Sequence, residues 1–123
     1  MNVYYDDDNV NILLSKTLVS VDVDMNEDTI TFVTSCGKKF VMFHDQECCE
    51  HVYIEDICGD INDLVGEPLV EAEEVSGYIG PDAEESYTWT FYKFRTVKGC
   101  VTIRWFGKSK GYYSESVNFM EVK

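Results

Sequence analysis

The sequence has no hydrophobic run that could cross a membrane, because none approaches the roughly 18 apolar residues that a membrane-spanning helix needs. It also lacks the basic amino-terminal segment of a secretory signal peptide, since it begins with the acidic stretch MNVYYDDDNV. We therefore expect a soluble, cytoplasmic protein.

Motifs of common catalytic machinery are absent as well. The chain has no phosphate-binding glycine loop, no H-E-x-x-H zinc motif and no G-x-S-x-G nucleophile motif. Neighbouring carboxylates occur throughout the chain, but acids are so frequent that no single pair indicates a catalytic site. We therefore expect a protein that is not an enzyme, with no catalytic residue and no cofactor.

Length and composition indicate an ordinary folded domain. The 123 residues can bury a hydrophobic core, and 45% hydrophobic residues with 17 aromatics exclude a disordered acidic tail despite the net charge of −13. Five cysteines, an odd number, fit a reducing compartment better than a disulfide framework. We expect a single domain over residues 1–123.

Positive charge is scarce and is confined to one part of the chain. Residues 1–85 hold 21 acids and three lysines, a net charge of −18, whereas residues 86–123 hold seven bases and two acids, a net charge of +5. Eleven of the 17 aromatics lie between residues 78 and 119. A negative field of this size repels nucleic acid and anionic membranes. We therefore expect neither as a partner, and we expect any anion site in the basic, aromatic part.

Alternation of apolar and polar residues along most of the chain predicts strands. The predicted strands are residues 10–14, 18–23, 29–34, 39–44, 52–57, 69–75, 87–96, 100–106 and 112–122. Gly37 predicts a tight turn between the third and fourth strands. Asp60 predicts the N-cap of a short helix that ends at Gly66 and Pro68. The predicted fold class is α+β, mainly antiparallel β-sheet with one or two short helices.

Residues 76–86, SGYIGPDAEES, form the only segment with the composition of a linker. The segment is rich in glycine, proline and acids, and it lies at the boundary between the acidic and basic parts of the chain. We interpret it as a mobile loop within one domain, because neither side has enough core to fold independently.

The segment TWTFYKFRTVKGCVTIRWF (residues 88–106) predicts a hairpin with Lys98 and Gly99 as its two-residue turn. This register places Val97 opposite Cys100, and it sorts the side chains onto two faces because they alternate along a strand. The predicted core face carries Tyr92, Phe94, Val101, Ile103 and Trp105. A slip of one residue would exchange the two faces.

The opposite face of this hairpin combines aromatic and basic residues. It carries Trp89, Phe91, Lys93, Arg95, Thr102, Arg104, Phe106 and Lys108. The register places Lys93 opposite Arg104, which brings like charges within about 5 Å unless an anion lies between them. Rings can stack on a nucleotide base while arginine binds phosphate oxygens. The alternative is a solvated outer face on which lysine and arginine stems cover the rings.

The segment FHDQECCEH (residues 43–51) has a composition suited to metal or thiol chemistry. A zinc site would take ligands from His44, Cys48, Cys49, His51, Cys58 and Cys36. The spacing matches no standard zinc motif and includes no C-x-x-C pair. A cysteine–histidine nucleophile is also conceivable, but acidic surroundings raise the pKa of a thiol. We interpret the segment as a structural corner of the fold and expect no metal.

The stretches FHDQECCEHVYIEDICGDINDLVGEPLVEAEEVS and ESYTWTFYKFRTVKGCVTIRWFGKSKGYYSESV resemble a family of small phage-encoded proteins, the first class of Thoeris anti-defence proteins, over residues 29–117. The resemblance implies a homo-oligomer, a dimer or larger, in the cytoplasm of a bacterial host. It implies that the protein sequesters a cyclic nucleotide immune signal of the glycocyclic ADP-ribose type without cleaving it. It also implies pockets near a subunit interface that use arginine and aromatic side chains.

The hairpin residues with this chemistry are the predicted ligand-binding set: Trp89, Phe91, Lys93, Arg95, Arg104 and Phe106, with Tyr112 and Tyr113 of the GYYSES segment as further rings. A second function is an acidic mimic of nucleic acid that inhibits a host nuclease such as a CRISPR effector, because the −18 charge of residues 1–85 would steer the protein into a basic cleft. A third hypothesis, a small thiol- or zinc-dependent hydrolase, is supported only by the segment FHDQECCEH.

Overall fold

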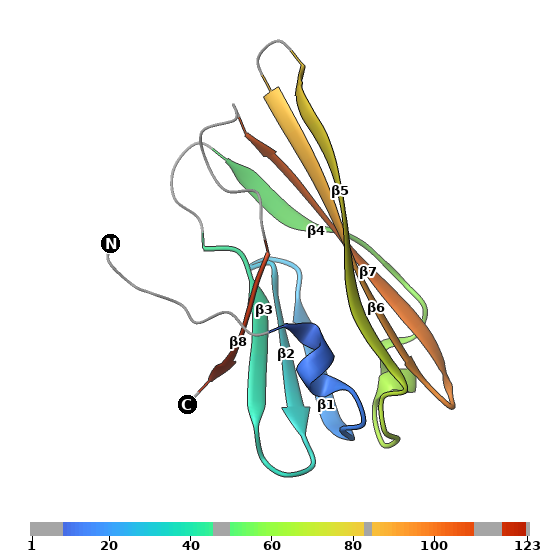
Figure 1. The fold of residues 1–123 in the computed structure, drawn as a ribbon. Coiled ribbons are helices and arrows are strands. Elements are labelled where there is room, and N and C mark those ends of the chain that lie inside the picture. The colour runs from blue at the N-terminus through green and yellow to red at the C-terminus, as the bar shows by residue number, and fades with distance from the viewer. Residues whose placement is uncertain (1–8, 46–49, 83–84, 110–116, 123) are drawn as a thin grey trace.

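The computed structural model describes residues 9–45, 50–82, 85–109 and 117–122, and these residues form two antiparallel four-stranded sheets that pack against each other (Figure 1). The first sheet has the order β1-β2-β3-β8, with β1 at Leu18–Asp24, β2 at Thr29–Thr34, β3 at Lys39–Phe43 and β8 at Asn118–Val122. The second has the order β4-β7-β6-β5, with β4 at His51–Cys58, β7 at Gly99–Ser109, β6 at Glu85–Thr96 and β5 at Glu71–Asp82.

The helical content of the described residues is two single-turn 3-10 helices, η1 (Val10–Leu13) and η2 (Ile61–Leu64). The Asp60 side chain caps η2 by accepting a hydrogen bond from the backbone N–H of Asn62, so the predicted cap is confirmed. The mainly antiparallel sheet is confirmed, but the fold is predominantly β. No helix in the described part of the chain is long and apolar enough to cross a membrane.

The strand predicted at residues 10–14 is wrong. Those residues form η1, whose first turn is capped by the Asn9 side chain accepting from the backbone N–H of Asn11. Val10 and Leu13, three residues apart, are buried on one side of this turn. In so short a segment, apolar spacing does not distinguish a 3-10 turn from a strand.

The hydrophobic core lies between the two sheets. The ring of Phe32 on β2 lies 5.6 Å from that of Phe94 on β6, and the indole N–H of Trp105 on β7 donates to the sulfur of Met42 on β3 at 3.2 Å. The predicted core face of the hairpin is confirmed, since Tyr92, Phe94, Val101, Ile103 and Trp105 are all at most 1% exposed. Each such apolar side chain contributes about 1.5–3 kcal/mol to folding.

The hairpin of β2 and β3 agrees with the sequence prediction. The strands pair antiparallel, and Gly37 in the connecting turn has a φ of 90°, which favours glycine. Of the strand predicted at residues 112–122, the structure describes β8; residues 112–116, with Tyr112 and Tyr113, lie outside the described part.

The loop predicted at residues 76–86 is wrong for the residues that the structure describes. Strand β5 runs to Asp82 and β6 starts at Glu85, so most of the segment is paired as a hairpin that extends the sheet. The segment has a long partner in β6, where Tyr87 and Trp89 favour strand structure. This pairing overrides the local preference of glycine and acids for loops.

The predicted turn of the β6–β7 hairpin is displaced by one residue. Val97 and Lys98 form the turn, and Thr96 pairs with Gly99. Gly99 does not supply a positive φ. A Cβ at that position would lie 2.6 Å from a carboxylate oxygen of Asp63 on η2, so glycine there makes room for the Asp63 side chain.

The displaced turn shifts the pairing register by two residues, so the two faces of the hairpin keep their predicted residues while the cross-strand pairs change. Lys93 lies opposite Thr102, and Arg104 lies opposite Phe91. The predicted opposition of Lys93 and Arg104 is therefore wrong, and the repulsion it implied gives no reason to expect an anion between them.

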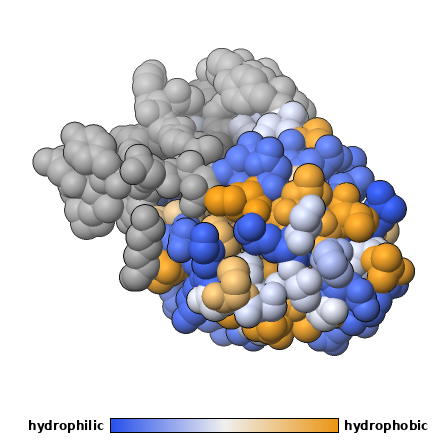
Figure 2. Space-filling view, turned by 60° about the horizontal axis from the view of Figure 1, so that its bottom comes forward, coloured by the Kyte–Doolittle hydropathy of each residue, from blue (hydrophilic) through white to orange (hydrophobic). Residues whose placement is uncertain are grey.

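Exposed apolar side chains at the lower end of the molecule are interspersed with hydrophilic ones. In the view of Figure 2, orange and blue residues alternate over the described surface rather than forming one continuous patch. Scattered exposed apolar residues are usual on soluble proteins and need no partner to cover them.

Candidate functional site

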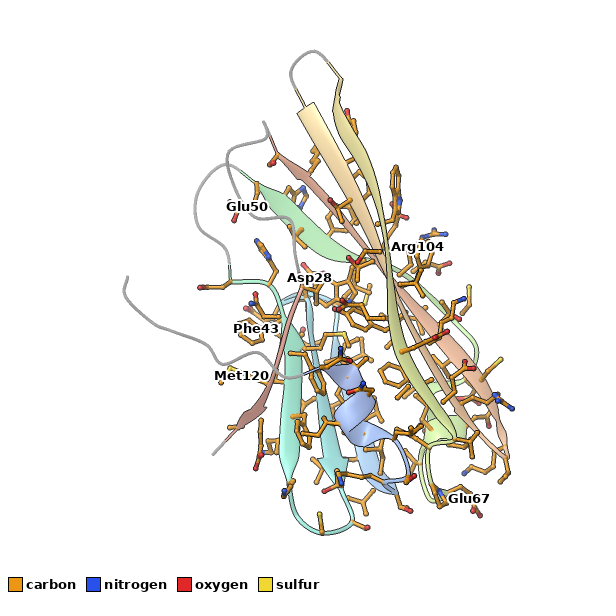
Figure 3. All side chains as sticks on the ribbon, in the orientation of Figure 1. Asp28, Phe43, Glu50, Glu67, Arg104 and Met120 are labelled. Carbon is orange, nitrogen blue, oxygen red and sulfur yellow. The ribbon has the colours of Figure 1, made fainter. Side chains whose placement is uncertain are left out.

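The outer face of the second sheet carries the six predicted ligand-binding residues that the structure describes. Trp89, Phe91, Lys93 and Arg95 come from β6, and Arg104 and Phe106 come from β7. In Figure 3, Arg104 lies on the side of this sheet that faces away from the first sheet. The structure divides this face into a charged half and an aromatic half.

In the charged half, bases of β6 lie directly opposite acids of the neighbouring strand. Glu73 on β5 pairs with Lys93, and Glu71 pairs with Arg95. Opposite charges at facing positions stabilise the sheet by roughly 0.2–1 kcal/mol per pair. This half therefore fits the solvated outer face that the sequence left open as an alternative.

Arg104 lies at the border between the two halves and is held by two acids of β4. Oε1 of Glu55 lies 2.6 Å from Nε of Arg104, and Oδ2 of Asp56 lies 3.9 Å from Nη2. An irregularity in the pairing between Ile54 and Asp56 brings the two consecutive acids to this arginine. The guanidinium side chain remains 39% exposed, so it can also contact a bound anion.

The contact between Arg104 and Glu55 is an ion pair without a well-directed hydrogen bond. Nε of Arg104 is buried and makes no hydrogen bond within the described residues, although the carboxylate oxygen is close to it. The Nε–H bond therefore does not point at that oxygen. Because both side chains are partly exposed, we expect the pair to contribute at most about 1 kcal/mol.

The aromatic half forms a continuous row of rings across three strands. The ring centroid of Phe106 on β7 lies 5.8 Å from that of Tyr53 on β4 and 5.0 Å from that of Trp89 on β6. The ring centroid of Tyr87 lies 5.9 Å from that of Phe106, and the ring centroid of His51 lies 4.6 Å from that of Tyr53. We call these five residues, His51, Tyr53, Tyr87, Trp89 and Phe106, the aromatic surface. All five are at least partly exposed to solvent.

Strand register brings these rings together. Phe106 is the direct partner of both Tyr53 and Trp89, and facing residues of antiparallel strands point to the same side of a sheet. The sequence identified Trp89 and Phe106 but not His51, Tyr53 or Tyr87. Period-two alternation in HVYIEDI places His51 and Tyr53 on one face, but nothing in the sequence shows that β4 lies beside β7.

A base lies on each side of Phe106 along β7. Arg104 precedes it by two residues and Lys108 follows it by two, so the three side chains share the outer face about 7 Å apart. Lys108 is exposed and lies opposite both His51 and Tyr87. This arrangement offers stacking for a planar ring and a positive charge on either side of it.

The corner predicted at residues 43–51 is partly described. Nε2 of His44, which directly follows β3, lies 3.0 Å from Oε2 of Glu50, which directly precedes β4, and their side chains are 4% and 0% exposed. His51 instead belongs to the aromatic surface. Cys48 and Cys49 lie outside the described residues. Within the described ranges, no group of three or more metal-binding side chains is present.

The described cysteines, Cys36, Cys58 and Cys100, are exposed free thiols. Cys36 lies in the turn between β2 and β3, where its sulfur is 3.1 Å from the Thr34 hydroxyl. This hydrogen bond, together with the backbone at Lys38, lowers the pKa of the Cys36 thiol.

A family model described as Domain of unknown function (DUF7448) matches residues 11–119. The matched range contains the whole aromatic surface together with Arg104 and Lys108. No curated protein and no solved structure matches the chain. The family description assigns no activity.

Proposed function

The chain belongs to the DUF7448 family, and we propose that it is a binding protein that sequesters a cyclic nucleotide signal of the cyclic ADP-ribose type without cleaving it. The observation that carries the proposal is the row of Tyr53, Phe106 and Trp89, with Arg104 and Lys108 on either side of Phe106. The resemblance to Thoeris anti-defence proteins supports the same class of ligand, a signal made by a TIR-domain enzyme.

The chemistry of this surface suits a nucleotide. A base that stacks on an aromatic side chain gains roughly 1–3 kcal/mol, without strong preference among bases. Phosphate oxygens form charge-assisted hydrogen bonds with arginine and ion pairs with lysine. In the proposal, Trp89 and Phe106 contact the base, and Arg104 and Lys108 bind phosphate.

Lys93 and Arg95, two of the bases predicted from the sequence, have a smaller part in this proposal. An acid lies directly opposite each of them on β5. A phosphate at these positions would lie near the negative charges of Glu73 and Glu71. Arg104 forms an ion pair with Glu55, but its side chain is 39% exposed and it lies next to the rings.

Capture by one chain alone would be weak. A nanomolar Kd corresponds to about 12 kcal/mol, whereas one stacked base and two charge-assisted hydrogen bonds supply about 4–9 kcal/mol before the cost of ordering the ligand. Tight binding therefore needs a more enclosed pocket. We propose that a second copy of the chain covers the aromatic surface, so that the functional form is a homo-oligomer.

The experiment that tests the proposal is thermal melting against ADP-ribose, cyclic ADP-ribose and its isomers, and cyclic di- and trinucleotides. A ligand at 100 times its Kd stabilises the folded state by about 2.7 kcal/mol, which raises Tm by roughly 10 °C for a domain of this size. We expect one cyclic nucleotide to raise Tm and to be released intact on denaturation.

Two results would contradict the proposal. Recovery of a cleaved nucleotide would show catalysis and would favour the thiol- or zinc-dependent hydrolase. A Tm that no nucleotide changes would favour the acidic mimic, whose activity against a nuclease should survive the loss of the Arg104 and Lys108 charges.

A further inference from the structure

Gly77 lies in the interior of β5, and neither its backbone conformation nor crowding by neighbouring atoms requires a glycine there. Gly59 has a φ of 105°, and a Cβ there would collide with the backbone of Cys100; Gly99 makes room for Asp63. Gly77, in contrast, has no positive φ of this kind, and apart from its two chain neighbours no described atom lies within 4 Å of a Cβ built on it. Glycine weakens a strand, and it often marks a place where a ligand approaches the backbone closely.

The position of Gly77 connects it with the aromatic surface. It is the direct cross-strand partner of Trp89, so a side chain there would point to the outer face beside the indole. Phe106 lies on the other side of Trp89, at 5.0 Å. Strand β5 is the last strand of the described sheet on that side, so the row of rings ends beside the open space over Gly77, which we call the notch.

The notch is not filled by Trp89 itself. In many sheets an aromatic side chain folds over a facing glycine and covers it. Here no described atom, including those of the indole, lies within 4 Å of the Cβ position of Gly77. In the next row of the same face, by comparison, Val75 lies opposite Phe91 and occupies the equivalent space.

We propose that Gly77 is a specificity-determining residue of the nucleotide site. The space left by its missing side chain admits a ribose of the nucleotide to the sheet surface while the base stacks on Trp89 and the phosphates reach Arg104 and Lys108 on β7. This inference rests on the proposed function. It adds that the ligand extends beyond Trp89 toward the edge strand β5.

The test compares Gly77→Val with Ser76→Val in the full chain. Both variants add a branched side chain to β5, but Ser76 faces Thr90 and points to the other side of the sheet. We expect Gly77→Val to weaken binding of cyclic ADP-ribose, or of the isomer that wild type binds, by about tenfold or more. Its Tm without ligand should be unchanged or higher, since valine favours strands. Ser76→Val should bind like wild type.

Tryptophan fluorescence gives a readout that does not need a ligand. The chain has two tryptophans, and Trp105 is 1% exposed, so quenching by acrylamide reports on Trp89. The measurement is made at a protein concentration at which sedimentation shows a monomer, so that no second copy covers Trp89. If the notch is open, Gly77→Val should then reduce the Stern–Volmer slope, whereas Ser76→Val should leave it unchanged. An unchanged slope for Gly77→Val would overturn the inference.

Phe106→Ala separates this inference from the proposed function. If Phe106→Ala abolishes binding but Gly77→Val binds like wild type, the role of Gly77 is wrong and the nucleotide surface stands. If Phe106→Ala also binds like wild type, or wild type binds none of the nucleotides, the proposed function fails and the role of Gly77 fails with it.

Discussion

At the scale of single residues, the two arginines of the chain have different surroundings on the same face of the second sheet. Arg104 lies beside the aromatic surface with a partly exposed guanidinium, whereas Arg95 lies in the charged half, opposite Glu71. Sequence composition singled out both arginines equally. The difference between them depends on which strand lies next to each one, and no local pattern in the sequence contains that information.

The first prediction compares Arg104→Gln with Arg95→Gln. Loss of a hydrogen bond between a charged group and phosphate costs about 1.5–3 kcal/mol, so Arg104→Gln should weaken nucleotide binding roughly 10- to 100-fold. Arg95→Gln should change the Kd by less than about threefold. Isothermal titration with the nucleotide found by melting checks both. Equal losses in the two variants would contradict the division into a charged and an aromatic half.

The second prediction concerns Cys36. Because the Thr34 hydroxyl lowers the pKa of this thiol, the reactive thiolate forms at lower pH than in the unfolded chain. The rate of iodoacetamide labelling at Cys36, followed by peptide mass spectrometry, increases as pH is raised and the thiolate forms. This increase should therefore begin at a lower pH in the folded protein than in the unfolded chain. Thr34→Val removes the hydroxyl and should shift the profile to higher pH. The same dependence of labelling rate on pH in the folded wild type, the unfolded chain and Thr34→Val would contradict this effect.

At the scale of elements, alternation in the sequence was sufficient to assign the two faces of the β6–β7 hairpin but not its register. The turn prediction treated Gly99 as a conformational requirement, whereas its role is steric and depends on Asp63 of η2, far away in the sequence. Because the error shifted the register by two residues, the core face remained correct. Tyr53 and His51 could not be assigned to the site from the sequence, because their place beside Phe106 and Lys108 depends on the pairing of β4 with β7.

The third prediction tests this assignment of faces with two adjacent residues of β7. Ile103→Ala creates a cavity in the core and should lower the free energy of unfolding by about 2–5 kcal/mol. Thr102→Ala, on the outer face, should change it by no more than about 0.5 kcal/mol. Urea denaturation followed by circular dichroism measures both. A larger effect at Thr102 would mean that the faces are reversed.

At the scale of the whole molecule, two sheets enclose the core, and the second presents an aromatic surface in a chain with a net charge of −13. An acidic protein that binds a phosphate-containing ligand needs positive charge near the contact. In the proposed site Lys108 would supply it together with Arg104, which also contacts Glu55 and Asp56. The open surface of one chain supplies too few contacts for tight capture. Oligomer formation is therefore part of the same account.

The fourth prediction concerns assembly. If a second copy covers the aromatic surface, Phe106→Ala should weaken self-association as well as ligand binding, because the ring would lie at the interface. Sedimentation velocity over a range of protein concentrations, with Thr102→Ala as the control on the same face, checks this. A wild-type chain that stays monomeric with and without bound nucleotide would contradict the homo-oligomer.

The measurement that tests the central claim most directly is a titration of wild type with cyclic ADP-ribose and its isomers, followed by Trp89 fluorescence. The buried Trp105 contributes a constant background, so a change reports on the aromatic surface. The account predicts a saturable change with one nucleotide, lost in Phe106→Ala and kept in Thr102→Ala. A nucleotide that raises Tm but leaves Trp89 fluorescence unchanged would show that the ligand binds elsewhere and would contradict the account.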